Sequence, residues 1–353
     1  MRIVIVGIGA IGSRHAACLG RAGHEVVTVD RNGNADFERV AGISGLSDVD
    51  YWVVATPTAT HLAVVTDILR RRPDARVLLE KPACYPAELA DLARTLRRHP
   101  RCRVVVNDVY AYSEAVRRFA ATVRRFGRSD PIRKITVEFT KNRELDVVHG
   151  RFVDTRYGEA GYEYFHMLSI LRSLLPGRQY RSYLRTHPAL ITSEMRVRTV
   201  GADLPEIELY ASSAGTIAFP GLAGFAFPAS VAKRYLESSR IPYGADMRYR
   251  FADVEFSSGK HVTLVFEPCY GTPVDYKNNH VVYVRDAVSS DHYPISGNHF
   301  DDAVLRQLDL LRQADDGTAL IRLAEHRFMA DLSMAVSTGG ASHDNFARQG
   351  SEE

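Results

Sequence analysis

Long apolar runs, paired cysteines and lysine are scarce in this sequence of 353 residues. No apolar run reaches the roughly 18 residues of a membrane-spanning helix, which argues against a membrane protein. No basic leader with a cleavage site precedes the first predicted strand, so we expect a cytoplasmic protein. The cysteines form no Cys-x-x-Cys pair, which excludes a zinc or redox site built on that motif and predicts free thiols. They are Cys18, Cys84, Cys102 and Cys269.

An excess of charge of one sign is also lacking. The formal net charge is +3, from 45 Lys and Arg against 42 Asp and Glu, and the basic residues are dispersed among acidic ones. This distribution gives no reason to expect nucleic acid or a membrane surface as a partner. The length and the 45% hydrophobic content suffice for about two domains with a substantial core.

Only six of the 45 basic residues are lysine, and one of them follows an apolar strand. This is Lys81, in Leu78-Leu79-Glu80-Lys81-Pro82. Ligands of open α/β sheets bind at the carboxyl ends of strands. Burial tunes the pKa of a lysine more readily than that of an arginine. Lys81 is therefore the first candidate for a functional residue.

The N-terminal residues carry the pattern of a dinucleotide-binding βαβ unit. An apolar, β-branched run predicts a strand over residues 2–6, and a helix over 10–21 and a second strand over 25–30 follow. A Gly-x-Gly-x-x-Gly pattern lies between the first strand and the helix, which is the context in which this motif binds a dinucleotide. Its residues are Gly7, Ile8, Gly9, Ala10, Ile11 and Gly12.

Each glycine of this motif has a separate predicted role. Gly7 permits the tight turn, Gly9 lets the backbone approach the pyrophosphate, and Gly12 lets helix and strand pack closely. The helix that starts at Ala10 and Ile11 presents its N-terminus to the anion. The motif therefore predicts a nicotinamide dinucleotide as cofactor.

Asp30 follows the second strand and bears on the choice of cofactor. Its carboxylate is expected to accept hydrogen bonds from a ribose hydroxyl and to repel a 2′-phosphate, which favours NAD. The adjacent Arg31 can hold a phosphate or stack on adenine, so NADP remains an alternative.

Strands and helices then alternate, as in a doubly wound parallel sheet. Thr56 and Pro57 end the third strand, and Thr58 or Thr60 is expected to cap the helix that follows. His61 lies at the start of that helix, where it either approaches the nicotinamide end of the cofactor or is a surface or capping histidine. The strands are expected over residues 50–56, 77–81 and 104–108, and the helices over 59–72 and 86–98.

Beyond residue 108 the pattern changes to alternating strands, which predicts a mainly antiparallel sheet with one polar face. The segment 219–240 is left unassigned. The expected elements are a helix over 113–126, strands over 132–139, 195–200, 206–210, 248–256, 262–266 and 281–284, and helices over 297–312 and 319–335.

Four motifs in this order resemble the glucose-fructose oxidoreductase, inositol dehydrogenase and rhizopine catabolism protein family, Gfo/Idh/MocA. They are the glycine motif, Thr56-Pro57 with His61 four residues on, Glu80-Lys81-Pro82, and a strand that ends in Asn107. The resemblance implies an α/β protein with a Rossmann domain over residues 1–122 and an α+β domain over 123–353. In such proteins a large, open, mainly antiparallel sheet walls the substrate pocket and joins subunits into a homodimer or homotetramer.

The usual reaction of this family is hydride transfer between NAD or NADP and the carbinol carbon of a sugar, aminosugar or cyclitol. The resemblance implies that Lys81 hydrogen-bonds the reacting hydroxyl and stabilises charge on its oxygen, that Glu80 orients the lysine, and that Pro82 fixes the turn. An imine or enone reductase and a catalytically silent dinucleotide-binding regulator are the alternatives. The further residues expected around the cofactor are Thr56, Pro57, His61, Glu80, Lys81 and Asn107.

A helix is predicted from Gly158 through Leu175, with His166 on its polar face. The resemblance implies that this histidine accepts the proton of the substrate hydroxyl, which suits an ordinary pKa near 6.5. The family commonly carries an aspartate four residues earlier. Here Tyr162 occupies that position, and Glu163 lies one step on, rotated by about 100°. Four interpretations stay open: Tyr162 relays the proton, Glu163 replaces the acid, the proton chemistry is lost, or His166 is structural.

Two further sets of residues carry groups of the kinds that bind metals or anions. Glu163 and His166 have no further ligands in a recognisable pattern, so we expect no metal. Arg143, His149 and Arg156 precede the helix and offer partners to a substrate phosphate or carboxylate. Solvated loop charges are the preferred interpretation of these three residues.

Overall fold

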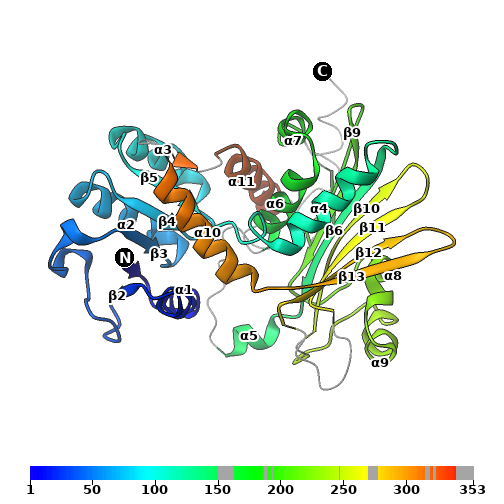
Figure 1. Cartoon of the computed structure of the whole chain (residues 1–353), viewed down its shortest axis with the longest axis horizontal. Helices are drawn as coiled ribbons and strands as arrows, with labels where there is room; N and C mark the ends of the chain where they lie inside the picture. Colours follow the sequence, from blue (N-terminus) through cyan, green and yellow to red (C-terminus); the bar gives the residue numbers. More distant parts are fainter. Residues whose placement is uncertain are drawn as a thin grey trace. The chain divides into compact units, whose positions relative to one another are not determined.

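The computed structural model describes residues 1–149, 163–186, 189–192, 194–245, 247–268, 277–314, 319–320 and 323–338. The chain divides into two compact units, whose elements are labelled in Figure 1. The first consists of Met1–Val109 and Phe300–Ala330, and the second of Tyr110–His299 and Asp331–Glu353. No helix among these described residues is long and apolar enough to cross a membrane.

The first unit is built on a parallel sheet whose described strands follow the order β14-β5-β4-β3-β1-β2. Most residues of its central strands are apolar and buried, as expected for a parallel sheet covered on both faces. The order changes direction between β1 and β3, and open α/β sheets bind ligands at such a point. The strands are β1 (Arg2–Val6), β2 (Glu25–Val29), β3 (Tyr51–Val54), β4 (Arg76–Leu79), β5 (Arg103–Val106) and β14 (Ala319–Leu320).

Helices pack on both faces of this sheet (Figure 1). Those on one face are α2 (Thr58–Arg71) and α3 (Leu89–Arg98), and those on the other are α1 (Ala10–Arg21) and α10 (His299–Gln313). Thus α10 packs on strands that all come from the first 109 residues. The connecting segments include the short helices η1 (Val40–Gly42), η2 (Leu46–Asp48) and η3 (Pro86–Glu88), and α11 (Leu323–Thr338) follows β14.

The second unit contains a sheet whose described strands follow the order β13-β12-β11-β10-β6-β9-β8-β7. Neighbouring strands are antiparallel except for β6 and β9, which are parallel. The strands are β6 (Ile132–Lys141), β7 (Ala189–Thr192), β8 (Arg196–Gly201), β9 (Leu204–Ser212), β10 (Arg248–Phe256), β11 (His261–Phe266), β12 (Asn279–Arg285) and β13 (Ser290–Ser296).

The two faces of this second sheet are covered differently. The helices α4 (Glu114–Phe126) and α6 (Phe165–Leu174) pack on one face. On the other face, the segment left unassigned from the sequence packs its apolar side chains against Tyr249, Phe251 and Val265. That segment contains the short elements α8 (Pro220–Ala223), η5 (Gly224–Ala226), α9 (Ala229–Val231) and η6 (Ala232–Leu236), and the unit also contains α5 (Glu144–Val148) and α7 (Gly177–Tyr183).

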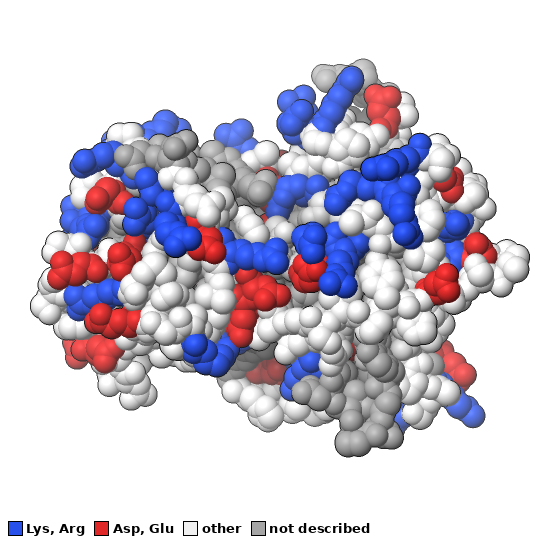
Figure 2. Space-filling model, in the orientation of Figure 1, with Lys and Arg blue, Asp and Glu red and all other residues white. Residues whose placement is uncertain are grey.

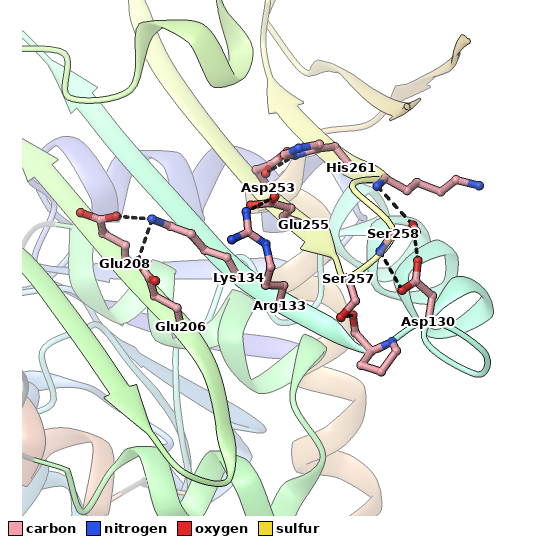
Figure 3. Close-up of polar contacts among 12 residues, drawn as sticks. Asp130, Arg133, Lys134, Glu206, Glu208, Asp253, Glu255, Ser257, Ser258 and His261 are labelled. Atoms are coloured by element: carbon pink, nitrogen blue, oxygen red, sulfur yellow. Dashed lines mark hydrogen bonds and ion pairs between the residues drawn. The ribbon is translucent and has the colours of Figure 1, made fainter. Parts of the chain in front are cut away.

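Ion pairs connect neighbouring strands on the polar part of this sheet (Figure 3). Lys134 of β6 reaches two carboxylates of β9, with Nζ 2.8 Å from Oε1 of Glu206 and 2.7 Å from Oε2 of Glu208. Arg133 of the same strand pairs with Glu255 of β10. Because each pair joins strands that are adjacent in the sheet, the pairs favour the observed register.

Basic side chains are more prominent than acidic ones on the face drawn in Figure 2, and acidic side chains lie among them. On α4, for example, the exposed Arg117 and Arg118 both pair with Glu114, at 2.6 and 2.8 Å. Such pairing within one helix is typical of a solvated face, in line with the small net charge.

Each strand and helix predicted from the sequence has a counterpart among the described residues, with ends that differ by a few residues. Residues 158–162 of the helix predicted from Gly158 lie outside the described residues, and the start of the helix predicted over 319–335 is wrong, because Ala319–Leu320 form β14. Three strands were missed: β7, β13 and β14. The prediction of a threonine cap on α2 is wrong. Pro57 occupies the N-cap, and the hydroxyl of Thr60 donates back to the carbonyl oxygen of Pro57 at 2.8 Å, because both threonines lie inside the helix. Cys18, Cys84 and Cys102 are buried free thiols, and Cys269 lies outside the described residues.

Candidate active site

The glycine motif forms the loop between β1 and α1, and the protein itself requires two of its glycines. Gly7 has a φ of +96°, and a Cβ on it would lie 2.8 Å from backbone atoms of Ala55 and Thr56. A Cβ on Gly12 would lie 1.8 Å from the carbonyl oxygen of Gly7. Both observations fit the tight turn and the close packing of helix on strand that the motif predicts.

Gly9 differs, because neither its backbone conformation nor a neighbouring protein atom requires a glycine at this position. Its φ of −74° is open to any residue, and a Cβ would have no atom within 4 Å. The space beside Gly9 therefore suits a group that approaches from outside the protein. The backbone N–H groups of the first turn of α1, from Ala10 and Ile11 onwards, are those that a pyrophosphate would bind. These residues fit a bound dinucleotide.

Asp30 lies directly after β2 and holds the glycine loop. Its Oδ2 accepts a hydrogen bond from the backbone N–H of Ile8 at 2.7 Å, and its Oδ1 accepts one from that of Asn32 at 3.0 Å. The neighbouring Arg31 is exposed. A carboxylate at the loop suits ribose hydroxyls, and an exposed guanidinium beside it suits a 2′-phosphate, so this arrangement accommodates NAD or NADP.

His61 connects the turns that follow β3 and β4. Its ring is buried, with Nδ1 2.9 Å from the carbonyl oxygen of Pro82 and Nε2 2.7 Å from that of Thr56. Burial lowers the pKa of His61, although both carbonyl groups act in the opposite direction. The interpretation as a surface or capping histidine is therefore wrong, since the ring lies inside the protein and spans two turns. The hydroxyl of Thr56 is buried and has no hydrogen-bond partner among the described residues.

Glu80 is the buried acid beside the candidate lysine. Its Oε1 lies 2.7 Å from Nε2 of His15 and accepts a hydrogen bond from Nδ2 of Asn107 at 2.6 Å, while its Oε2 accepts one from the backbone N–H of Lys81 at 3.2 Å. Burial raises the pKa of Glu80, but the hydrogen bonds from His15 and Asn107 and the ammonium of Lys81 outweigh burial and lower it. Glu80 is therefore an ionised carboxylate inside the unit.

The chain of hydrogen bonds continues from Asn107 into α10. Nε2 of Gln307 donates to Oδ1 of Asn107 at 2.8 Å and to the carbonyl oxygen of Ala303 at 2.9 Å. Oε1 of Gln307 accepts from the backbone N–H of Asp108 at 2.9 Å. Both ends of the Asn107 amide are thus bound by the protein, and its predicted contact with the cofactor stays a prediction.

The Lys81 turn is also held on its other side. The peptide bond between Lys81 and Pro82 is cis. The backbone N–H of Ala83 donates to Nε2 of the buried His326 at 3.1 Å. The side chain of Lys81 is half-buried at the carboxyl end of β4, on the same edge of the sheet as the glycine loop.

In the second unit, Glu163 is a buried carboxylate between two arginines. Its Oε1 accepts hydrogen bonds from Nη2 of Arg143 at 2.7 Å and from Nη2 of Arg250, on β10, at 2.6 Å. The preferred interpretation of Arg143 as a solvated loop charge is therefore wrong, because its side chain is only 14% exposed in this ion pair. His149 is exposed, and Arg156 lies outside the described residues.

His166 lies on α6, in a cluster of rings within the second unit. Its ring centroid is 4.7 Å from that of Tyr110, which in turn lies 5.3 Å from His299 and 5.1 Å from Phe266. His299 stacks on His280 at 3.8 Å. Burial lowers the pKa of His280 to about 4 and that of His299 well below its ordinary value, so both rings are neutral at physiological pH.

The structure places the predicted residues in two separate sets. The first unit holds the glycine motif, Asp30, Arg31, Thr56, Pro57, His61, Glu80, Lys81 and Asn107, and the second holds Glu163 and His166. Tyr162 lies outside the described residues. No group of three or more potential ligands among the described residues is arranged to hold a metal ion.

Sequence reasoning missed several residues of these sets: His15, Gln307, His326, Tyr110 and Arg250. Only His15 carries a usable signal. It shares the buried face of α1 with Gly12 and Leu19, at spacings of three and four residues, so its burial was predictable. A buried histidine requires a polar partner, and the partner of His15 lies on another strand.

Comparisons with known proteins agree with this geometry. Residues 1–107 match the model of a protein family described as the oxidoreductase family with an NAD-binding Rossmann fold, Gfo/Idh/MocA. A search of curated proteins found no match.

Solved structures resemble the chain over nearly its whole length. A UDP-N-acetylglucosamine 3-dehydrogenase from Acidithiobacillus ferrooxidans has 15% identity and a TM-score of 0.59, over 98% of this chain and 99% of that one. A 3-ketoreductase from Actinomadura kijaniata, solved with TDP-benzene and NADP, has 14% identity and a TM-score of 0.60, over 96% and 97%. A Gfo/Idh/MocA family oxidoreductase from Vibrio cholerae has 10% identity and a TM-score of 0.61, over 97% and 100%. Residues 1–107 therefore match the Gfo/Idh/MocA oxidoreductase family by sequence, and the whole chain resembles solved members of that family in fold.

Proposed function

We propose that this protein transfers a hydride between NAD(P) and a carbinol carbon of a sugar, aminosugar or cyclitol. The observation that carries the proposal is the Lys81 turn. It places one half-buried ammonium at the carboxyl edge of the Rossmann sheet and is held by buried polar partners on both sides. The reactions named for two of the similar structures, a sugar-nucleotide 3-dehydrogenase and a 3-ketoreductase, are of this class.

In this proposal different residues of the chain stabilise the reacting oxygen and remove its proton. Bound NAD(P) supplies the group that accepts or donates the hydride. Lys81 donates a hydrogen bond to the substrate oxygen and stabilises the negative charge that develops there. His166, or Tyr162 in its place, removes the hydroxyl proton in the oxidative direction.

The surroundings of Glu163 bear on which residue handles the proton. A carboxylate oxygen that accepts hydrogen bonds from two guanidinium groups is a poor proton acceptor. We therefore assign Glu163 the role of a counter-ion for Arg143 and Arg250, and we favour His166 or Tyr162 as the acid/base.

The remaining parts of the proposal concern cofactor and assembly. Asp30 favours NAD, with NADP as the alternative because of Arg31. The proposed Rossmann domain spans residues 1–122 and the substrate domain 123–353. We propose a cytoplasmic homodimer or homotetramer that associates through the second sheet.

The test compares the wild type with Lys81→Ala and Lys81→Arg. Each protein is incubated with NAD or NADP and a panel of polyols, sugars and nucleotide sugars, and nicotinamide reduction is followed by absorbance. Removal of a preorganised donor to a developing oxyanion lowers kcat by about a hundredfold or more, so we expect this loss in Lys81→Ala with little change in dinucleotide affinity.

Three results would contradict the proposal. Near-wild-type turnover in Lys81→Ala, with normal dinucleotide binding, would refute the role of the lysine. Tight dinucleotide binding without turnover of any panel member would favour a silent dinucleotide-binding subunit. Turnover of amines instead of alcohols, seen by product analysis, would favour an imine reductase.

A further inference from the structure

Four buried polar side chains from four elements form one hydrogen-bonded chain in the first unit. His15 of α1 and Asn107 after β5 bind Glu80 after β4, and Gln307 of α10 binds Asn107. All four are at least 90% buried. Glu80, to which two of the other three side chains bind, immediately precedes Lys81.

The carboxylate of Glu80 depends on these donors. An ionised carboxylate can only accept hydrogen bonds, and its burial is tolerable when donors replace water. Two donors converge on Oε1, from His15 and Asn107, and the backbone N–H of Lys81 serves Oε2. Loss of one donor therefore leaves a buried negative charge that is short of hydrogen bonds.

His15 is the member of this chain that connects the cofactor loop to the lysine. It lies on α1, whose first turn is the expected pyrophosphate site, about 7.5 Å along the helix axis from Ala10 at 1.5 Å per residue. The ring of Phe300 packs against it with centroids 4.7 Å apart, which fixes its orientation. Because Glu80 can only accept, Nε2 of His15 carries the proton that is shared with the carboxylate.

We infer that His15 is a positioning residue for Lys81. It keeps the Glu80 carboxylate ionised and in place, and Glu80 in turn holds the backbone N–H and attracts the ammonium of Lys81. The helix that would receive the cofactor thereby also orients the lysine that would contact the substrate. This inference rests on the proposed role of Lys81 in hydride transfer.

The test replaces His15 by leucine, asparagine and glutamine in the full chain. Leucine fills a similar volume without a donor, and asparagine keeps a polar side chain that stops short of Glu80. The Nε2–H of glutamine can take the place of the imidazole donor. Cys18→Ala is the matched control, because Cys18 is another buried residue of α1 and its electrostatic partners are Asp301, Arg21 and Arg14.

The first readout is the split between kcat and dinucleotide affinity. A hydrogen bond to a charged group corresponds to about a tenfold to hundredfold effect. We expect kcat to fall by about this factor in His15→Leu and His15→Asn, with dinucleotide affinity within about twofold of the wild type. His15→Gln and Cys18→Ala should retain most of the wild-type kcat. The acid limb of the kcat profile should move to higher pH in His15→Leu, because loss of the His15 hydrogen bond leaves burial less opposed and raises the pKa of Glu80.

The second readout follows Lys81 without turnover. Its Nζ is labelled by reductive ¹³C-methylation and titrated by NMR, and the Lys81→Arg variant assigns its resonance among those of six lysines. Without the His15 donor the Glu80 carboxylate is no longer held in place beside Lys81, so the ammonium is stabilised less and its titration midpoint should fall in His15→Leu and recover in His15→Gln.

The outcomes separate this inference from the proposed function. A Lys81 midpoint and a kcat that are unchanged in His15→Leu and His15→Asn would overturn the inference. A loss of kcat in His15→Gln equal to that in His15→Leu, together with a lower thermal midpoint, would show that His15 has only a structural role and would also overturn the inference. A shifted Lys81 midpoint in His15→Leu, combined with full activity of Lys81→Ala, would support the positioning role and refute the proposed function of the lysine.

Discussion

Glu138 on β6 gives the second unit a pH-dependent stability that can be measured. Its buried side chain accepts hydrogen bonds from the backbone N–H groups of Ala218 at 3.0 Å and Phe219 at 2.9 Å, and from the hydroxyl of Thr140 at 3.0 Å. Burial raises the pKa of Glu138 to about 8 from an ordinary 4.5, although these hydrogen bonds lower it. The folded protein therefore binds this proton more tightly than the unfolded chain does.

The sign of the effect follows from this difference in pKa. Below about pH 4.5 Glu138 is protonated in both states, and its full contribution to stability is present. Between about pH 4.5 and 8 the unfolded chain ionises first, so the contribution is lost progressively as the pH rises. At about 1.4 kcal/mol per pH unit this range corresponds to about 5 kcal/mol at most, and we expect a loss of about 2–5 kcal/mol.

The assay is hydrogen exchange of the β6 backbone amides, which reports the opening free energy of the second sheet. Tryptophan fluorescence is unsuitable, because the single tryptophan, Trp52, lies in β3 of the first unit. Glu138→Gln is the control, since it keeps the shape of the side chain without titrating. The opening free energy of the wild type relative to Glu138→Gln should fall by about 2–4 kcal/mol between about pH 5 and 8. A difference that stays constant over this range would refute the reasoning, because it would mean that the three donors keep Glu138 ionised.

Two further predictions concern the candidate site. Gly9→Ala should leave the thermal midpoint nearly unchanged and weaken dinucleotide binding by about tenfold or more, because its Cβ meets no protein atom and stands where the pyrophosphate would approach. Gly12→Ala should instead lower the free energy of unfolding by about 1–3 kcal/mol, since its Cβ would overlap the carbonyl oxygen of Gly7. Equal effects of both variants on the free energy of unfolding would contradict this contrast. Arg250→Leu should lower the unfolding free energy by about 3–5 kcal/mol in urea titrations, because it removes one donor from the buried Glu163, and a change below about 1 kcal/mol would show that Arg143 alone suffices.

The sequence predicted best those elements whose signals are local. The bounds of α1 were predicted correctly because a glycine-rich loop precedes it and an apolar period follows. The strand β14 was missed because it contains two residues, Ala319 and Leu320, and exists only through pairing with β5. Nothing in the sequence near residue 319 specifies that partner, which lies more than 200 residues away in the chain.

The same limit applies to the site. Lys81, Asp30 and the glycine motif could be found because each stands at the end of a strand, where position in the sequence predicts position on the sheet edge. The partners of Glu80 could not be found in this way, since His15 precedes it by 65 residues and Gln307 follows Asn107 by 200. The solvated-charge interpretation of Arg143 failed for a related reason, because its partner Glu163 lies 20 residues further along the chain.

Three of the 13 histidines converge on the turn from Glu80 to Ala83, and the chemistry of the imidazole explains why this residue type recurs there. The turn presents a carboxylate, a carbonyl oxygen and a backbone N–H that lie inside the unit, so it needs both donors and an acceptor. His15 serves the Glu80 carboxylate, His61 lies at the Pro82 carbonyl, and His326 accepts from the N–H of Ala83. A neutral imidazole carries one donor and one acceptor, so a single side-chain type meets all three needs without water. The polar groups of this turn are bound by imidazole rings from three separate helices, so the turn has little freedom to move. That rigidity is the condition under which one lysine can be presented in a fixed orientation.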